Sequence, residues 1–516
     1  MGQYVMGIDV GTTGTKAMVV DTEGHIIGRG YREYPLITEK NFEVEADAED
    51  IIQKVFDVTK EAVETSGLDP SEIKAVSFSV QRASFFLLDE NMEPLNNRLT
   101  VWLDTRPTPY MEEIKQLISD DDARKMTGMG VSPYSVPPKV YTIRKTQPEL
   151  YARAKYIAAV DTYVLHRFGS DRLTGDICTA MIMSLVDKQT FNWCDKMLDI
   201  YDIPKDMMYE LVKPGTVVGT IKEDISERTG LAVGTLIVAG AGDQQAGAMG
   251  SAIVNDGDIS LTLGTVGMFI VGNANPDFDK LPGLMVPSTP NIGVFEIEGN
   301  QSSGATCYRW ARDVLCAEEI KEAEAEGKDP YDVMGRLIDE SGPGARGVMF
   351  NAALFGSGYP YWDGSTTGAF MGLRNFHNKG DMLRAVMEGI TLESRVMLEA
   401  IKATGAKIND EITIAGGAVK SPTWRQIVAD VMNKRVKVLK QADASIIGVA
   451  IIAAKAAGFI KDFQEGVDRM VEIDCTVDPI PENAELYDKL FDIYKDLYKM
   501  FKEYNISGRL AEAVKK

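Results

Sequence analysis

The chain has 516 residues, of which 45% are hydrophobic and 25% are charged. This is the composition of a globular protein, and the length exceeds what one hydrophobic core usually supports, so two large domains or several smaller ones are expected. The formal net charge of −21 disfavours nucleic acids and anionic membranes as partners, because an acidic surface repels phosphate groups. A small anionic nucleotide remains compatible, since backbone N–H groups and a bound cation can hold phosphate locally.

The five cysteines form no Cys-x-x-Cys pair, which favours reduced thiols in a cytoplasmic protein. The three histidines lie far apart in the sequence, so a histidine-rich zinc site is not expected. Tyr4–Val10 is apolar and lacks a basic flank, which favours a first strand over a signal peptide. The apolar stretch Ala444–Ile460 contains Lys455 and many small residues, and it predicts a buried helix rather than a membrane span.

In chain order, the first predicted elements form a β-meander. Short apolar runs divided by turns predict strands over Tyr4–Asp9, Lys16–Asp21 and His25–Gly30. Apolar residues at helical spacing, followed by a glycine, predict a helix over Ala48–Ser66. Strands alternating with helices then continue to the strand Leu236–Gly240, which indicates an α/β protein. Two further strands are predicted over Lys74–Ser79 and Phe85–Asp89. The last predicted element is an amphipathic helix over Asn483–Lys502.

A weak internal repeat favours two similar halves. Gly11-Thr12-Thr13-Gly14 follows the first predicted strand, and Gly264-Thr265-Val266-Gly267 follows the predicted strand Asp258–Thr262. Two such turns can also arise by chance, so the repeat alone leaves duplication open. The turn-rich segment at Val254–Gly257 marks the predicted boundary, with domains over residues 1–254 and 255–516.

The two Gly-Thr turns are the first candidate sites. Their glycines permit close approach of a ligand, and successive N–H groups and threonine hydroxyls can donate to phosphate oxygens. Asp9, at the end of the first strand, offers the oxygen ligand that Mg²⁺ prefers. An ordinary hairpin with a side-chain-capped turn remains the alternative for each turn.

Two further turns end predicted strands. Gly416-Gly417, followed by Ser421, lies between a strand and a helix, where backbone can pass close to a flat or charged ligand. A tight strand-to-helix loop without a ligand is the competing interpretation. Asp243, after the strand Leu236–Gly240, could accept the proton of a substrate hydroxyl, as kinase chemistry requires. A helix N-cap is the alternative for this carboxylate.

No segment has the Gly-x-x-x-x-Gly-Lys pattern of a P-loop. The order of the four motifs resembles the FGGY carbohydrate kinases, which belong to the actin-like ATPase superfamily, and the resemblance covers nearly the whole chain. Gly368–Leu373 with Asp381–Glu388 is similar to the family's C-terminal signature, and Thr423–Asp430 resembles the helix that follows its adenine loop. Thr142 departs from the family, which usually has tryptophan at that position of its other signature.

The resemblance implies two ribonuclease-H-like α/β domains flanking a catalytic cleft, with sugar and base in the first domain and nucleotide in the second. It implies ATP and Mg²⁺ as cofactors and in-line transfer, with Asp243 as the catalytic base and Asp9 and Asp243 as the magnesium ligands. The residues implied to contact the nucleotide are Gly11, Thr12, Thr13, Gly264, Thr265, Gly416, Gly417 and Ser421.

The resemblance also implies a set of substrate-binding residues, namely Gln81, Arg82, Asp104, Tyr134, Asp243 and Gln244. Gln81-Arg82-Ala83 matches the Gln-Arg-Glu segment of glycerol kinases except for the lost carboxylate. For Asp104, binding of sugar hydroxyls and pairing with Arg106 are equally compatible with the sequence. The later motifs look closer to xylulokinases, and Tyr308–Asp313 is similar to autoinducer-2 kinases. We therefore expect a ketopentose such as xylulose as substrate, with autoinducer-2 kinase and glycerol- or erythritol-type polyol kinase as alternatives.

An alternative from another class is an actin-like ATPase that acts on a protein partner. Such proteins need an appended substrate domain or a polymer surface, and the sequence predicts neither after the two halves. A requirement for added sugar in ATP turnover would separate the two hypotheses. The expected partner is therefore a small sugar or polyol, with no nucleic acid and no membrane, and a homodimer is compatible with the sequence.

Overall fold

The computed structural model of the chain describes residues 2–281, 283–440 and 443–514. The chain divides into two compact units: unit 1 comprises Met1–Val254, Met285–Glu296 and Asp443–Glu472, and unit 2 comprises Asn255–Leu284, Ile297–Ala442 and Ile473–Lys516. The predicted boundary after residue 254 coincides with the first change of unit. Two later segments return to unit 1, however, so the second half of the sequence contributes to both units.

The main sheet of unit 1 has six strands in the order β12-β13-β6-β1-β2-β3. Strands β1 to β3 form the predicted antiparallel meander, whereas β6 and β13 run parallel to β1. Val80 of β6 pairs with Val10 of β1 and with Gly242 of β13, so both neighbouring strands end level with it. The bounds are β1 Tyr4–Val10, β2 Gly14–Asp21, β3 Ile26–Glu33, β6 Ile73–Val80, β12 Val217–Thr220 and β13 Leu236–Gly242.

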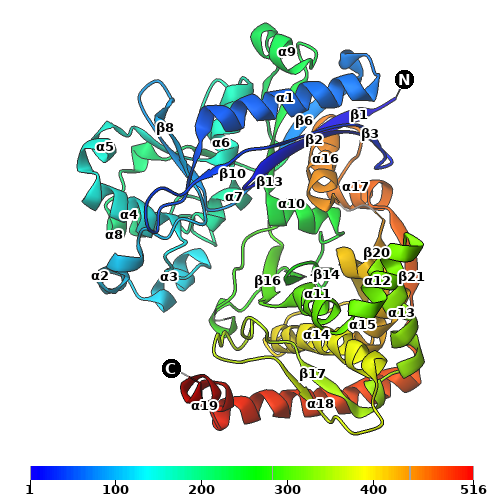
Figure 1. The fold of residues 1–516 in the computed structure, drawn as a ribbon. Helices are drawn as coiled ribbons and strands as arrows, with labels where there is room; N and C mark the ends of the chain where they lie inside the picture. Colours follow the sequence, from blue (N-terminus) through cyan, green and yellow to red (C-terminus); the bar gives the residue numbers. More distant parts are fainter. Residues whose placement is uncertain (1, 282, 441–442, 515–516) are drawn as a thin grey trace. The chain divides into compact units, whose positions relative to one another are not determined.

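Helix α1 covers Ala48–Ser66, as its spacing predicts, and packs on β2 and β3 (Figure 1). The Asp47 side chain caps its first turn, and Gly67 ends it in the left-handed conformation, with φ of 67°. A Cβ on Gly30 of β3 would lie only 2.4 Å from the carbonyl oxygen of Val58, so glycine is needed for this close packing.

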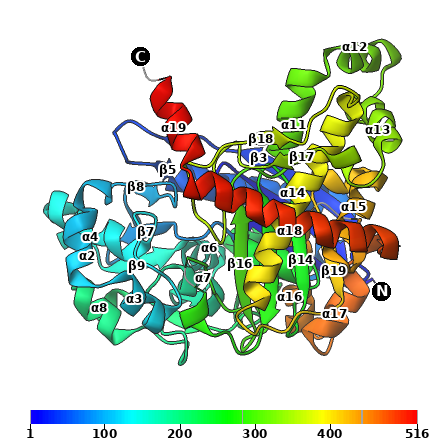
Figure 2. The same ribbon diagram turned by 90° about the horizontal axis from the view of Figure 1, so that it is seen from below.

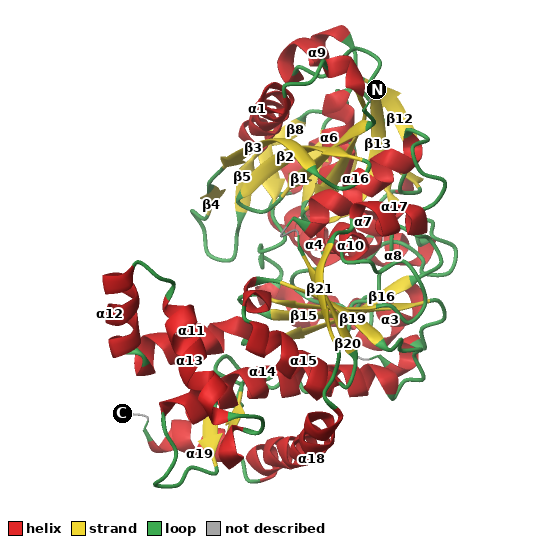
Figure 3. Cartoon of the chain, turned by 90° about the vertical axis from the view of Figure 1, so that its right-hand side faces the viewer, coloured by secondary structure: helices red, strands yellow, loops and turns green. Residues whose placement is uncertain are grey.

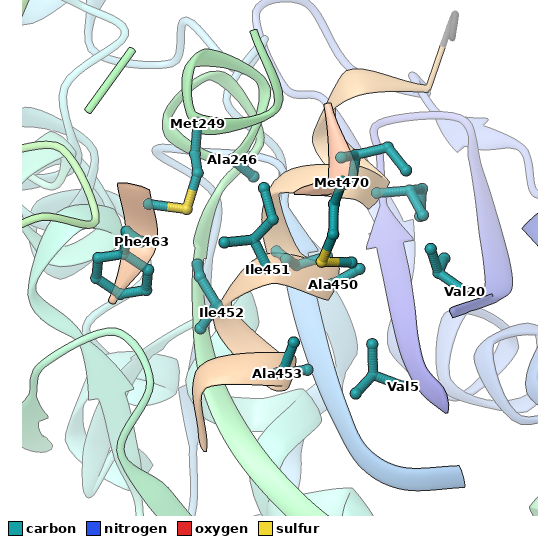
Figure 4. Packing of buried hydrophobic residues seen from close by; sticks show 14 of the residues in the cluster. Val5, Val20, Ala246, Met249, Ala450, Ile451, Ile452, Ala453, Phe463 and Met470 are labelled. Carbon is teal, nitrogen blue, oxygen red and sulfur yellow. The ribbon is translucent and has the colours of Figure 1, made fainter. Parts of the chain in front are cut away.

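Helix α16, Ala444–Ala456, is buried in the core of unit 1 against β1, β6 and α10 (Figure 4). A Cβ on Gly448 would lie 1.9 Å from the carbonyl oxygen of Ala246 in α10, so the two helices are in backbone contact at this point. The expectation of a buried helix is therefore confirmed. Among the described residues, no helix is both long and apolar enough to cross a membrane.

A second sheet of unit 1 has the order β4-β5-β8-β7-β9 and lies beside helix α4, Val136–Thr146. Its strands are β4 Leu36–Ile37, β5 Glu45–Asp47, β7 Phe85–Leu88, β8 Pro94–Thr100 and β9 Tyr156–Ala159, and β10 Thr174–Asp176 pairs separately with β11 Glu210–Val212. The other helices are α2 Met111–Leu117, α3 Asp120–Thr127, α5 Pro148–Arg153, α6 Val160–Phe168, α7 Ile177–Ile182, α8 Asp195–Tyr201, α9 Glu223–Thr229, α10 Asp243–Gly250 and α17 Phe463–Met470.

The sheet of unit 2 has the order β16-β15-β14-β19-β20-β21. Strands β14 and β15 form an antiparallel hairpin, β19 and β20 run parallel to β14, and β21 is antiparallel to β20. Figure 3 labels β15, β19, β20 and β21 of this sheet. Read from β3 to β12, the main sheet of unit 1 has the same strand order, so the two units have similar sheets, as the weak internal repeat favoured. The bounds are β14 Ile259–Leu263, β15 Gly267–Asn273, β16 Phe295–Gln301, β19 Glu411–Ala415, β20 Arg435–Leu439 and β21 Ile473–Val477.

Helices cover the sheet of unit 2. The long helix α14 contacts β15, α15 contacts β20 and β21, and α18 packs against both α14 and α15 (Figure 2). Trp424 of α15 is buried and donates from its indole nitrogen to Thr391 of α14 at 3.2 Å. The elements are α11 Gly304–Leu315, α12 Ala317–Glu326, α13 Pro330–Ser341, α14 Lys379–Lys402, α15 Pro422–Met432, α18 Pro481–Glu503, α19 Ile506–Ala513, β17 Met349–Asn351 and β18 Ala369–Met371.

Candidate functional site

Asp243 is the first residue of α10, directly after β13 ends at Gly242. Its side chain is 34% exposed, so the carboxylate is accessible to a ligand. Arg82 Nε lies 3.2 Å from Asp243 Oδ1, and the backbone N–H of Gln244 donates to the same oxygen at 2.7 Å. A helix N-terminus and a guanidinium both favour the ionised carboxylate, which is the form that can accept a proton.

Asp9 lies at the carboxyl end of β1, opposite Ser79 of β6. The Ser79 hydroxyl donates to Asp9 Oδ1 at 2.6 Å, and Lys16 Nζ lies 3.8 Å from Asp9 Oδ2. Burial raises the pKa of the Asp9 carboxyl above its ordinary value, although Lys16 and Ser79 oppose this effect. The carboxylate is therefore held by one hydroxyl and one cation at the same sheet edge at which β13 delivers Asp243.

The first Gly-Thr turn connects β1 and β2 and is fixed from three sides. Gly11 N–H donates to the carbonyl oxygen of Gly14 at 2.9 Å, closing the turn. The Trp102 indole N–H donates to the Thr12 hydroxyl at 2.9 Å, and the Tyr34 hydroxyl donates to the Gly11 carbonyl oxygen. Thr13 is exposed at the tip of the turn, where its side chain can reach a ligand.

Two residues of the expected substrate set are buried and have hydrogen-bond partners inside the protein. Gln81 is 1% exposed, donates to the Gly11 carbonyl oxygen at 2.9 Å, and accepts from the Ser84 hydroxyl at 2.9 Å. Asp104 is fully buried and forms a bidentate ion pair with Arg106 at 2.8 Å from each oxygen. The structure thus favours the ion-pair alternative for Asp104. Sequence spacing alone does not reveal this, because it does not tell which side chains point inward.

Two other residues of the expected substrate set lie near the surface. Tyr134 precedes α4 and its side chain is half exposed. Gln244 follows Asp243 on α10 and is partly exposed. Both side chains are therefore accessible from the surface of unit 1, as Asp243 is.

The second Gly-Thr turn connects β14 and β15 in unit 2 and rests on the N-terminus of α11. The N–H of Ala305 donates to the Gly264 carbonyl oxygen at 2.8 Å, and the Thr306 hydroxyl donates to the Thr265 carbonyl oxygen at 2.5 Å. A Cβ on Gly304 would lie 2.5 Å from the Gly267 nitrogen, so the helix end contacts the turn without side chains between them. Thr265 is exposed and available to a phosphate.

The glycine pair at the end of β19 lies beside this turn. Ala415 pairs with Thr262 of β14, and a Cβ on Gly416 would lie 2.5 Å from the Leu263 carbonyl oxygen. Gly416 has φ of 96°, whereas no atom lies within 4 Å of a Cβ built on Gly417. Ser421 caps α15 by accepting from the N–H of Trp424 at 3.3 Å, so its hydroxyl has a structural partner.

The residues of unit 1 can hold Mg²⁺ only if a bound substrate supplies phosphate oxygens as further ligands. Among the described residues, no cluster of three or more acidic, histidine or cysteine side chains could hold a metal ion. Mg²⁺ usually binds one or two protein carboxylates and completes its shell with water and phosphate oxygens. Asp9, a single carboxylate with 17% of its side chain exposed, matches this donor set.

Sequence reasoning missed one basic residue of this site, Lys16. Lys16 pairs with Asp9 across the hairpin and donates to Asp443 Oδ1 at 2.8 Å. Burial lowers the pKa of Lys16, but Asp9 and Asp443 outweigh that effect and hold it above its ordinary value. Alternation along β2 could have placed Lys16 beside Asp9. No local signal could have brought in Asp443, which is more than 400 residues away in the sequence.

Comparison with known proteins finds a family match for the N-terminal part of the chain and another for the C-terminal part. Residues 4–250 match the N-terminal domain of the FGGY family of carbohydrate kinases, and residues 259–457 match its C-terminal domain. The chain is 28% identical to a gluconokinase of Bacillus licheniformis over 96% of each chain, and 27% identical to a xylulose kinase of Bacillus subtilis (strain 168) over 98% of each chain. A crystal structure of ligand-bound xylulose kinase from Lactobacillus acidophilus is 25% identical and has a TM-score of 0.85, covering 97% of this chain and 98% of its own.

Proposed function

This chain belongs to the FGGY family of carbohydrate kinases and is an ATP-dependent kinase of a sugar or polyol, and on that premise we propose that Asp243 is its catalytic base. The observation that carries this assignment is the position of the carboxylate. It directly follows the interior strand β13, is accessible to a ligand, and lies beside the guanidinium of Arg82. The same sheet edge carries Asp9 and the first Gly-Thr turn.

The proposed reaction is a direct transfer of the terminal phosphoryl group of ATP. The substrate hydroxyl oxygen forms a bond to the γ-phosphorus while the bond to the bridging oxygen of ADP breaks. Asp243 accepts the hydroxyl proton as this bond forms, which increases the nucleophilicity of the oxygen. Arg82 orients the carboxylate and keeps it ionised before the transfer.

Phosphate binding is proposed for both Gly-Thr turns. In unit 1, Thr12 is oriented by the Trp102 indole, and Thr13 is exposed at the turn. In unit 2, the carbonyl oxygens of Gly264 and Thr265 are bound to α11, which leaves the exposed side of the turn for a ligand. Hydrogen-bond donors at such positions stabilise charge on the transferred phosphoryl oxygens. Mg²⁺ held through Asp9 would neutralise phosphate charge when the metal nucleotide is bound.

For the substrate we propose a ketopentose such as xylulose. The xylulose kinase from Bacillus subtilis aligns over 98% of this chain, which supports the choice. Ala83, which replaces the carboxylate of glycerol kinases, removes one acceptor for polyol hydroxyls and argues against glycerol. The residues leave autoinducer-2 and glycerol- or erythritol-type polyols as alternative substrates. The similarity to a gluconokinase adds sugar acids to these alternative substrates.

A substrate panel tests this proposal. ADP production is measured with xylulose, ribulose, glycerol, erythritol, gluconate and 4,5-dihydroxypentane-2,3-dione, each at several concentrations and against a control without sugar. We expect ATP turnover to require one of these compounds and kcat/KM to be highest for a ketopentose. A preference for another compound corrects the substrate. ATP turnover that ignores the whole panel but rises with an added protein would instead support an actin-like ATPase acting on a protein partner.

A further inference from the structure

Lys139 is a buried cation that the proposed reaction does not use. It lies in the first turn of α4, and its side chain has 0% exposure. Its ammonium donates to three backbone carbonyl oxygens, those of Trp102 at 3.0 Å, Val101 at 3.2 Å and Ala83 at 3.4 Å. Carbonyl groups satisfy its donors but do not neutralise its charge, so its burial carries a substantial desolvation cost.

The three carbonyl groups belong to two loops that carry residues of the site. Ala83, with φ of 54°, follows Arg82 in the loop between β6 and β7. Val101 and Trp102 follow β8, and the Trp102 indole holds the Thr12 hydroxyl. A further bond links the two loops, because the N–H of Trp102 donates to the Ser84 hydroxyl at 2.8 Å. One ammonium group therefore joins the loop that orients the proposed base to the loop that orients the phosphate turn.

We propose that Lys139 is a positioning residue for the phosphoryl transfer: by binding these three carbonyl groups, its ammonium holds Arg82 beside Asp243 and Trp102 beside Thr12. Only the kinetic consequences of this inference rest on the proposed function. The loop-fixing role itself is a property of unit 1 and can be tested without a substrate.

The charge of Lys139 is sensitive to pH in the physiological range. Burial lowers the pKa of Lys139 to about 7, an effect that the carboxylate of Asp104 opposes and the guanidinium of Arg106 reinforces. These two groups face it from the loop after β8, and Arg106 is itself bound to Glu45 of β5 at 2.8 Å. A neutral amine has two N–H donors instead of three and presents a lone pair, so deprotonation leaves one carbonyl group without a donor.

Hydrogen–deuterium exchange of the full chain without substrate, at pH 6 and pH 8.5 and corrected for intrinsic rates, tests the loop-fixing role. In the wild type we expect the protection of residues 81–84 and 101–106 to fall about tenfold or more at the higher pH. Lys139→Met should show the lower protection at both values, while Lys139→Arg, whose charge persists, should keep the higher protection. Lys145→Met is the matched control, because Lys145 lies on the same helix but is exposed and paired with Glu113.

Wild-type protection of both loops in a folded Lys139→Met protein would overturn the proposal. If Lys139→Met does not fold, Lys139→Leu takes its place, with the same expected loss of protection and the same contradicting result. If helix α1 lost as much protection as the two loops, the variant would have a general stability defect. This result would also count against the proposal. With an accepted sugar, kcat/KM of the wild type should decline above pH 7, and this decline should be absent in Lys139→Met. If no sugar is phosphorylated, the proposed function fails while the exchange result still stands.

Discussion

Arg82 Nε lies 3.2 Å from Asp243 Oδ1, and the arginine side chain reaches this position by passing over Gly242. A Cβ on Gly242 would lie 2.5 Å from Gln245 Oε1 and 2.8 Å from both Cγ and Cδ of Arg82, so a larger residue at the strand end would force these side chains to move. The pair thus depends on Gly242, the last residue of β13, and on the loop that follows the neighbouring strand β6. It gives the proposed base an ionised and oriented carboxylate.

Asp243→Asn should abolish most phosphorylation while leaving nucleotide binding nearly unchanged. The amide keeps the size of the side chain but accepts no proton from the substrate, so we expect kcat to fall by about 100- to 10,000-fold. A coupled assay measures turnover, and titration with ADP measures binding. Asp195→Asn is the control, because Asp195 is also the first residue of a helix but is 69% exposed and pairs with Lys205. Turnover near the wild-type value in Asp243→Asn would remove this residue from the mechanism.

Arg82→Met and Gly242→Ala should impair the same interaction by different routes. The first removes the cation, and the second places a methyl group 2.8 Å from Cγ and Cδ of Arg82 and 2.5 Å from Gln245 Oε1. We expect each to lower kcat/KM by roughly 10- to 100-fold and the double variant to be little worse than either one, because coupled residues are not additive. Gly335→Ala, where a Cβ meets no atom within 4 Å, controls for a glycine substitution as such. Additive losses would show that Gly242 acts independently of Arg82.

Local patterns were sufficient to predict the elements that carry this site. Helix α1 begins and ends where the apolar spacing and Gly67 place it. The Gly-Thr turns each join two antiparallel strands, and Asp243 lies at a strand-to-helix junction, as predicted. These features depend on residues close in sequence, so propensity and spacing specify them.

The remaining features depend on contacts between distant residues. The return of α16 to the core of unit 1 follows from its packing on β1 and α10, which no local pattern encodes. Gln81 and Asp104 have the residue types of a sugar site, yet they are buried, because their partners are Gly11 and Arg106. Residue type and order therefore predicted a candidate site, whereas side-chain orientation required the fold.

Gly417→Ala tests whether the glycine pair of unit 2 contacts the nucleotide. An added methyl group at Gly417 meets no protein atom within 4 Å, so we expect the Tm to stay within about 2 °C of the wild type. ADP affinity, measured by calorimetric titration, should fall roughly tenfold, because the family resemblance implies that Gly417 lines the adenine pocket and the methyl group would occupy that space. Gly416→Ala provides the contrast: its Cβ would lie 2.5 Å from the Leu263 carbonyl oxygen, so stability and affinity should both fall. Unchanged ADP affinity in Gly417→Ala would place the adenine elsewhere.

Glu393 of α14 provides a prediction about the stability of unit 2. Its Oε2 atom is buried and has no hydrogen-bond partner among the described residues, and burial raises the pKa of Glu393 to about 8. Since its ordinary pKa is 4.5, the folded chain holds a proton there that the unfolded chain has released between pH 4.5 and 8. The stability that the neutral carboxyl contributes is therefore complete below pH 4.5 and is lost as the pH rises to about 8.

Glu393→Gln should remove this pH dependence, because the amide has no proton to lose. We expect the variant to resemble the wild type at pH 5 and to become more stable than it at higher pH, by up to roughly 1.4 kcal/mol per pH unit within the window. Thermal unfolding at pH 5, 6, 7 and 8 follows the difference in Tm. Glu399→Gln on the same helix is the control, because its side chain is 40% exposed and its Tm difference should not grow with pH. A constant Tm difference between Glu393→Gln and the wild type across this range would mean that Glu393 is already ionised in the folded chain at pH 5.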